Sequence, residues 1–202
     1  MNKMLSLPPG TAAPPPGTDD DVLLERMRDD DVEAYRALVE RHMDRAFGVA
    51  MRVLKNTSDA EDVTQDAFVK AWLNRHKWEP GRARFSTWLY RVVVNRCIDL
   101  RRAPRQEWID DVPEPMDEGE DSVSSIHRRQ VYGRLEDALG RLPTQQRVAV
   151  VLSYYEDLSN AEIAEVMNSS VSAVESLLKR GRKGLRDILK TSEQDVKIVF
   201  GD

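Results

Sequence analysis

The sequence predicts an all-α fold of two small helical bundles joined by a flexible acidic linker. Apolar residues recur at helical spacing through most of residues 19–104 and 124–190, and no segment shows the alternation typical of a strand. Charge divides the 202-residue chain in the same way: residues 32–104 carry 14 Lys and Arg against 9 Asp and Glu, whereas residues 105–130 carry 3 against 8. A chain of this length holds one domain or two small ones, so the acidic segment is predicted to connect two domains.

The ends of the chain and its composition argue against several classes of protein. Residues 1–18 contain five prolines and predict a disordered tail, because they cannot bury enough apolar surface to offset the entropy of ordering them. We expect a cytoplasmic protein without membrane insertion, since no apolar run approaches the roughly 20 residues that cross a bilayer and no signal peptide is apparent. The single cysteine, Cys97, lies among apolar residues and is predicted to be buried. We predict no metal site and no cofactor, because neither the cysteine nor the three scattered histidines have ligand spacing.

Helix-start signals divide the first domain, which is expected to span residues 19–104. Acidic clusters at residues 19–21 and 29–31 occupy positions where carboxylates stabilise helix N-termini, so a helix is predicted to follow each cluster. Ser58 followed by Glu61 has the spacing of a capping box and predicts the start of a third helix.

The segment from Arg82 to Arg102 is the strongest local indication of function. Its sequence, RARFSTWLYRVVVNRCIDLRR, places three aromatic residues among six arginines and a single acid. Aromatic faces stack on unpaired bases and guanidinium groups neutralise phosphates, so this pattern is typical of single-stranded DNA binding. The basic loop of residues 76–84 is suited to receive a base turned out of a duplex. Alternatives remain open, because Trp88 is equally suited to core packing and the arginines to a solvated helix face.

The acidic linker is expected over residues 105–123, which are rich in Pro, Asp, Glu and Ser and lack helical periodicity. The second domain then spans residues 124–190, with a first helix that stops near Gly140 and three more helices at about 144–156, 160–167 and 171–189. Residues 191–202 are predicted to form a C-terminal tail, and we have no functional explanation for its apolar cluster.

The second domain carries a helix-turn-helix pattern between Ser159 and Lys183. Ser159 and Glu162 form a capping box that starts a short helix, and Asn168 occupies the tight turn, where a residue that tolerates positive φ is required. Ser170 is placed to cap the following helix, whose exposed face offers groups that contact base edges and phosphates of duplex DNA. An ordinary helical hairpin with a solvated basic face is the alternative.

Three motifs in this order resemble the extracytoplasmic-function (ECF) sigma factors of bacterial RNA polymerase: DAEDVTQDAFVKAW, FSTWLYRVVVNRCIDLRR and LPTQQRVAVVLSYYEDLSNAEIAEVMNSSVSAVESLLKRGRKGLRDIL. The resemblance covers about residues 28–190 and implies that the first bundle is sigma region 2 and the second is sigma region 4. It implies a protein without catalytic activity that binds core RNA polymerase, through the β′ coiled coil and the β flap, and promoter DNA. Relatives are usually held inactive, so a cognate anti-sigma factor is also expected.

The resemblance relates each motif to a partner. Contacts to the polymerase are expected from Asp59, Glu61, Asp62, Gln65, Asp66 and Phe68. Melting and holding of the −10 element are expected from Lys77, Arg82, Arg84, Ser86, Thr87, Trp88, Arg91, Asn95, Arg101 and Arg102. Recognition of the −35 element as duplex DNA is expected from Ser170, Ser172, Ala173, Glu175, Ser176, Lys179, Arg180, Arg182 and Lys183. The linker is expected to pass the active-site cleft of the polymerase.

Departures from the family pattern affect the −35 contacts. Asn168 replaces the glycine of many relatives, and Glu175 and Leu177 stand where many have a lysine and an arginine, so the preferred −35 sequence is not predicted.

The main alternative function is a helix-turn-helix transcriptional regulator with a helical sensor domain, which leaves the acidic and the aromatic-basic helices unexplained. A small all-α enzyme is the other alternative, but the sequence has no Gly-rich phosphate loop, metal-ligand spacing or nucleophile-base pattern.

Overall fold

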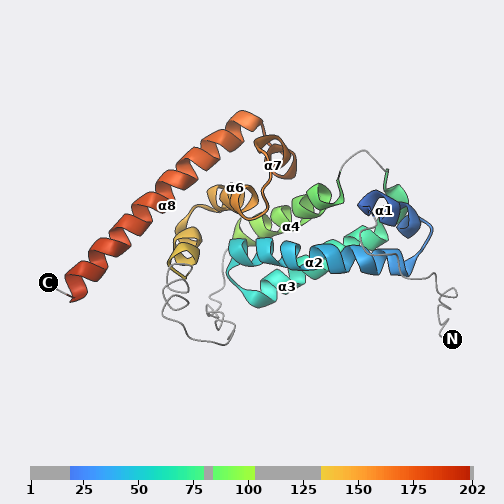
Figure 1. The fold of residues 1–202 in the computed structure, drawn as a ribbon, viewed down its shortest axis with the longest axis horizontal. Helices are drawn as coiled ribbons and strands as arrows, with labels where there is room; N and C mark the ends of the chain where they lie inside the picture. Colours follow the sequence, from blue (N-terminus) through green and yellow to red (C-terminus); the bar gives the residue numbers. More distant parts are fainter. Residues whose placement is uncertain (1–18, 80–83, 103–132, 201–202) are drawn as a thin grey trace.

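The computed structural model describes residues 19–79, 84–102 and 133–200, and these form helices without any strand, which confirms the predicted fold class (Figure 1). The elements are α1 (Asp20–Arg28), α2 (Val32–Leu54), α3 (Thr57–Leu73), the 3-10 turn η1 (Arg75–Lys77), α4 (Phe85–Arg102), a helix over residues 133–141, α6 (Thr144–Tyr154), α7 (Asn160–Val166) and α8 (Val171–Phe200). The predicted N-terminal tail, the acidic linker and Arg82 lie outside the described residues. Within the described ranges, no helix is both long enough and apolar enough to cross a membrane.

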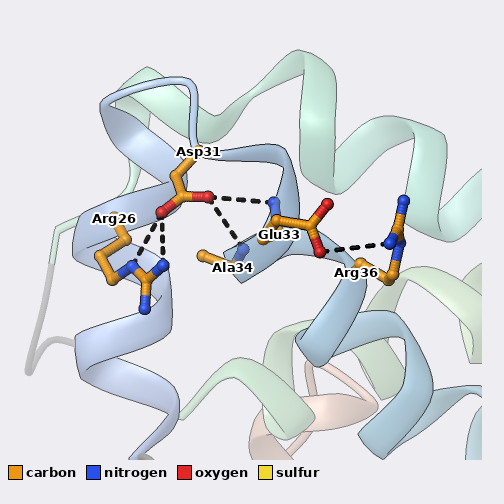
Figure 2. Close-up of polar contacts among 5 residues, drawn as sticks. All are labelled: Arg26, Asp31, Glu33, Ala34 and Arg36. Atoms are coloured by element: carbon orange, nitrogen blue, oxygen red, sulfur yellow. Dashed lines mark hydrogen bonds and ion pairs between the residues drawn. The ribbon is translucent and has the colours of Figure 1, made fainter. Parts of the chain in front are cut away.

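Aspartates start the first two helices, as their clusters predicted. Asp19 caps α1 by accepting a hydrogen bond from a backbone amide at 3.0 Å. Asp31 caps α2 by accepting from the amides of Glu33 and Ala34 at 3.0 and 3.2 Å (Figure 2). The Arg26 guanidinium lies 2.7 Å from the other oxygen of Asp31, so one buried carboxylate joins α1 to α2. These junctions depend on short-range bonds from side chain to backbone, which is why the local sequence predicts them.

The start of α3 differs from the prediction. Asn56, rather than Ser58, caps the helix, because its side-chain oxygen accepts a hydrogen bond from the Asp59 amide at 2.8 Å. Ser58 is the second residue of the helix and is exposed. The preceding residue, Lys55, has a φ of 58° and turns the chain so that Asn56 takes the extended conformation of a cap. The geometry of this turn therefore decides between two residues that are both suited to capping.

The first bundle is built around α2, which contacts α1, α3 and α4. Leu38, Val49 and Val53 of α2 are fully buried, and Leu89 of α4 joins the same core. Cys97 is buried as predicted. Its burial, with a further contribution from the charge of Asp59, raises the pKa of the thiol to about 12.

The second bundle is formed by residues 133–141, α6, α7 and α8. α8 crosses α6 so closely at Gly181 that a Cβ atom there would lie 2.7 Å from Cγ2 of Val150. The helix also continues to Phe200, so most of the segment predicted as a C-terminal tail is helical. The C-terminal part of α8 extends away from the other helices (Figure 1).

The two bundles pack against each other, which the linker prediction did not anticipate. α6 contacts α2 and α4, α7 contacts α4, and apolar residues of both bundles form one continuous core. Arg147 of α6 is 1% exposed and donates from Nη1 to the Val53 carbonyl of α2 at 2.6 Å. Its Nη2 donates to the Leu142 carbonyl at 3.1 Å and to the Gly140 carbonyl. Burial, together with the nearby charge of Arg101, lowers the pKa of Arg147 to about 10, so the guanidinium stays charged at neutral pH.

Candidate nucleic-acid interface

An aromatic cleft lies beside the C-terminal end of α3 and is closed by α4. It encloses about 510 Å³ and is lined by Ala71, Asn74, Lys77, Trp78, Glu79, Trp88 and Arg91. The rings of Trp78 and Trp88 meet edge to face with centroids 5.7 Å apart, and Phe85 stacks on Trp88 at 6.1 Å. Phe85 is buried, whereas Lys77 and Arg91 are exposed, so the cleft combines a supported aromatic wall with accessible cations.

The size and chemistry of the cleft suit a nucleobase. Small-molecule pockets typically enclose about 300–1,000 Å³, and aromatic rings bind bases by stacking. Asn74 adds an amide to the wall; its nitrogen donates to the Lys70 carbonyl at 2.9 Å, and Nζ of Lys77 lies 3.4 Å from its oxygen. The cations can neutralise the phosphates on either side of a bound base.

The structure separates the residues predicted to bind −10 DNA into exposed and buried groups. The exposed residues are Lys77, Arg84, Arg91, Asn95 and Arg102, and the half-buried ones are Ser86, Trp88 and Arg101. Thr87 is 5% exposed and points into the core, so its side chain is structural, contrary to the prediction. Trp88 packs on the core, which was one of the two interpretations of this residue, and its ring also lines the cleft. The sequence analysis did not predict that Asn74 lines the cleft, because the spacing between Asn74 and α4 along the chain gives no indication that the two meet.

The acidic face of α3 is open to solvent. Asp59, Glu61, Asp62, Gln65 and Asp66 are all exposed. All of these except Glu61 border a hollow of about 200 Å³ that Arg96 and Leu100 of α4 also line. Phe68 differs from the prediction, because it is 3% exposed and supports α3 from the core side. Val69 and Leu73, which are 46% and 67% exposed, extend the surface with apolar groups that the sequence analysis did not single out.

The helix-turn-helix prediction agrees with the geometry of α7 and α8. The Ser159 hydroxyl accepts from the Glu162 amide at 3.3 Å, and the Glu162 carboxylate accepts from the Ser159 amide at 2.9 Å, which completes the capping box. The Ser159 hydroxyl also donates to the Glu162 carboxylate at 2.7 Å, and this bond, together with the one from the Ser159 amide, lowers the pKa of Glu162. Asn168 has a φ of 48° at the turn, and the Ser170 hydroxyl accepts from the Ala173 amide at 3.2 Å at the start of α8.

The face of α8 that was predicted to contact DNA is accessible. Ala173 is half-buried, whereas the other members of the predicted set are exposed: Ser170, Ser172, Glu175, Ser176, Lys179, Arg180, Arg182 and Lys183. Val174 and Leu177 are buried on the opposite side, as their spacing predicted. Hydroxyl and carboxylate groups therefore lie near the N-terminus of α8 and cations further along it, an order suited to base edges and then phosphates.

α7 lies directly against α4, so the turn that leads into α8 comes near the N-terminal part of α4. Nη1 of Arg84 is 3.1 Å from the Glu162 carboxylate. Nε of Arg91 donates to the Glu165 carbonyl at 3.0 Å. A hollow of about 520 Å³ separates Arg91 from the turn that includes Asn168.

Both bundles match known families. Residues 38–107 match the family Sigma-70 region 2, and residues 132–185 match the family Sigma-70, region 4. The chain is 30% identical to the ECF RNA polymerase sigma factor SigW of Bacillus subtilis (strain 168), an alignment that covers 83% of this chain and 95% of the relative. It is 31% identical to the ECF RNA polymerase sigma factor SigK of Mycobacterium sp. (strain KMS), over 87% of this chain and 93% of the relative.

Solved structures share the architecture. The structure of CnrH in complex with the cytosolic domain of CnrY has 30% sequence identity and a TM-score of 0.65, over 85% of this chain and 97% of CnrH. The sigma factor RpoE, in complex with the anti-sigma factor NepR from Bartonella quintana, has 20% identity and a TM-score of 0.62, over 77% of this chain and 96% of that one, and shares the fold.

Proposed function

Because this chain belongs to the ECF sigma factors of bacterial RNA polymerase, we propose that three of its surfaces divide the work of promoter-specific initiation. The acidic face of α3 binds core polymerase, the aromatic cleft holds the melted −10 element, and α8 reads the −35 element as duplex DNA. The observation that carries this proposal is the combination, on one chain, of an aromatic cleft with cations and a helix-turn-helix. An ordinary duplex-binding regulator needs only the second of these.

The proposed boundaries follow the two bundles. Region 2 spans residues 19–104, the linker residues 105–123 and region 4 residues 124–190. The family matches at residues 38–107 and 132–185 lie in the corresponding parts of the chain and support this division.

At the −10 element, the cleft captures a base that has left the duplex. Stacking of a base on an aromatic side chain contributes about 1–3 kcal/mol, which is comparable to the cost of unstacking it. Trp88 supplies the ring, while Lys77 and Arg91 bind the neighbouring phosphates. Loss of the aromatic wall therefore removes the stacking energy that offsets the cost of melting the −10 element, while the duplex contacts made by α8 remain.

At the polymerase, the carboxylates of α3 accept hydrogen bonds from basic groups of the β′ coiled coil. Asp62 and Asp66 lie one helical turn apart, and the exposed side chains of Val69 and Leu73 continue the surface along the helix. The β flap is the second expected contact on the core enzyme. Phe68 acts indirectly, by packing α3 against the bundle.

A cognate anti-sigma factor is the third proposed partner. CnrH and RpoE, which share this fold, were both solved with protein partners, the cytosolic domain of CnrY and the anti-sigma factor NepR. A protein that covers the exposed face of α3 would compete with the polymerase for the same carboxylates.

The proposal is tested by comparing Trp88→Ala with Trp72→Ala in reconstituted holoenzyme. Both tryptophans are half-buried in the first bundle, but Trp72 packs on Tyr35 and Arg75 rather than lining the cleft. On a promoter selected by run-off transcription with wild-type holoenzyme, Trp88→Ala should bind the closed promoter normally. The amount of open complex that this variant forms, measured by permanganate reactivity at −10, should fall about 5- to 150-fold, the equivalent of about 1–3 kcal/mol.

A template with a pre-melted −10 bubble should restore part of the transcription by Trp88→Ala, because the melting cost is already removed. Trp72→Ala should open the promoter normally once both variants have been matched for thermal stability. Wild-type opening by a folded Trp88→Ala protein, or an equal defect in Trp72→Ala, would show that the cleft does not hold the −10 element.

A further inference from the structure

The exposed face of α8 continues beyond the residues that are proposed to read the −35 element. Polar residues with exposed side chains recur along the helix at alternating intervals of four and three: Ser172, Ser176, Lys179, Lys183, Arg186 and Lys190. Residues at these intervals lie in one line, because an α-helix has about 3.6 residues per turn. The last four form a cation stripe, which therefore continues the line of the two hydroxyls.

Packing on the opposite side of α8 fixes the direction in which the cation stripe points. Val174 is fully buried, and Leu185 and Ile188 are partly buried against the same core. Gly184 lies so close to the rest of the second bundle that a Cβ atom there would be 2.8 Å from Cδ2 of Leu142. The helix is therefore anchored along most of the stripe rather than only at the helix-turn-helix.

The charge around the stripe is almost entirely positive. Residues 179–190 contain six Lys and Arg and a single acid, Asp187, although the net charge of the chain is −5. The four cations of the stripe form no ion pair with any other residue that the structure describes. A solvated helix face is typically laced with charges of both signs, so this composition favours a partner that supplies the negative charge.

The length of the stripe fits duplex DNA. At a rise of about 1.5 Å per residue, Arg186 and Lys190 lie about 15 and 21 Å beyond Ser176 along the helix. The major groove of B-form DNA is about 12 Å wide and is bordered by the phosphates of both strands. A helix that reaches base edges near Ser176 therefore carries its later cations over the phosphates at the border of the groove.

We propose that Arg186 and Lys190 form a flanking contact, which binds phosphates of the duplex next to the −35 element whatever its sequence. This inference rests on the proposed reading of the −35 element by α8. Figure 1 shows that the C-terminal part of α8 extends away from the other helices, which leaves room for a duplex beside it. Because phosphates carry no sequence information, the flanking contact adds affinity to every promoter and leaves the choice of promoter to the N-terminal part of α8.

The flanking contact is tested by the salt dependence of promoter binding by reconstituted holoenzyme. Arg186→Gln, Lys190→Gln removes two cations and keeps good helix formers at both positions. Each phosphate contact contributes about −0.9 to the slope of log affinity against log salt concentration, so the slope of this double variant should be less negative by about 1.8. Between about 50 and about 200 mM salt, wild-type holoenzyme should therefore lose about 12-fold more affinity for the closed promoter than the variant loses.

Two further variants separate a phosphate contact from a general effect of charge. Arg134→Gln, Arg141→Gln makes the same change in charge at exposed positions of the helix of residues 133–141, and its slope should equal that of wild type. Arg186→Lys, Lys190→Arg keeps both charges on α8 and should also keep the wild-type slope. An unchanged slope in Arg186→Gln, Lys190→Gln, or an equal change in the control on the other helix, would overturn the flanking contact.

Neutral methylphosphonates locate the phosphates that the contact uses. Single substitutions on both sides of the −35 element should weaken wild-type binding at one or two positions outside the element. At those positions the variant Arg186→Gln, Lys190→Gln should be insensitive, because the cations that they would contact are absent. Sensitivity restricted to phosphates within the element, or equal sensitivity of wild type and variant at every position, would refute the proposal.

Failure of the proposed −35 function gives a different pattern. Selection from randomised duplexes should show that Ser176→Ala changes the preferred −35 bases, whereas Arg186→Gln, Lys190→Gln leaves them unchanged. If Ser176→Ala and Glu175→Ala both leave the preference unchanged, α8 does not read the element and the flanking contact is refuted with it. If the preference depends on Ser176 but the salt slope does not depend on Arg186 and Lys190, only the flanking contact is refuted.

Discussion

The turn of the helix-turn-helix offers a sharp test of how one backbone angle supports promoter recognition. Asn168 has a φ of 48°, and the next amide, that of Ser169, donates to the Ala164 carbonyl at 2.9 Å. A residue with a Cβ atom pays about 1–2 kcal/mol in this left-handed conformation, and Asn is among the few residues that relieve part of it. Asn168→Ala should therefore lower the free energy of unfolding by about 1 kcal/mol, and Asn168→Val by about 2 kcal/mol because of its branched side chain.

Asn168→Gly distinguishes backbone strain from the loss of the side chain. Glycine removes the steric cost, but it costs about 0.5–1 kcal/mol more conformational entropy on folding, so the two effects offset and the change should stay within about 0.5 kcal/mol. For a 202-residue chain whose bundles share one core, 1 kcal/mol corresponds to a Tm shift of about 2–4 °C. Asn160→Ala, in the first turn of α7, changes the same side chain at an ordinary helical position and serves as the control.

The series is measured by urea unfolding followed by circular dichroism, with hydrogen exchange of α7 and α8 to locate the change. Binding of a −35 duplex by holoenzyme should follow the same order, with Gly close to wild type and Val the weakest. If Asn168→Gly and Asn168→Ala are equally destabilised, the asparagine side chain matters rather than its backbone angle, and the reasoning is refuted.

Two further predictions concern the polymerase surface and the single thiol. Reversing charge with Asp62→Lys and Asp66→Lys should weaken core polymerase binding more than about tenfold and leave the helical spectrum normal, because like charges are brought together at the interface. The control is the exposed pair Glu40→Lys and Asp44→Lys on α2, which makes the same change in charge elsewhere. Equal competition for core enzyme by wild type and both double variants would disprove the contact. Cys97 should resist thiol reagents at pH 8 until urea unfolds the first bundle. The pKa of this thiol is raised from 9.0 to about 12 in the folded chain. The contribution of the thiol to stability is therefore complete below pH 9 and is lost as the pH rises toward 12. Cys97→Ala should flatten the dependence of the unfolding free energy on pH in that range.

Features that depend on neighbours in the sequence were predicted correctly. The helix starts at the acidic clusters of residues 19–21 and 29–31, the cap at Ser159 and the left-handed turn at Asn168 all follow from bonds or angles within a few residues. Helical periodicity likewise separated Val174 from the DNA-facing side of its helix. Such signals are local, so a single sequence contains them. The cap of α3 is the exception, because Asn56 and Ser58 are both suitable and the turn at Lys55 decides between them.

Features that depend on segments far apart in the sequence required the tertiary structure. A motif places Phe68 and Thr87 among functional residues, but only packing shows that both face the core. Asn74 reaches the cleft because α4 returns across the end of α3, and Arg147 reaches Val53 across 94 positions of sequence. Composition and periodicity specify which residues prefer burial, whereas the partner of a buried group is chosen by the three-dimensional path of the chain. The sequence alone therefore determined two helical bundles and their family, whereas contacts between distant segments decided which residues of the predicted surfaces face solvent and which face the core.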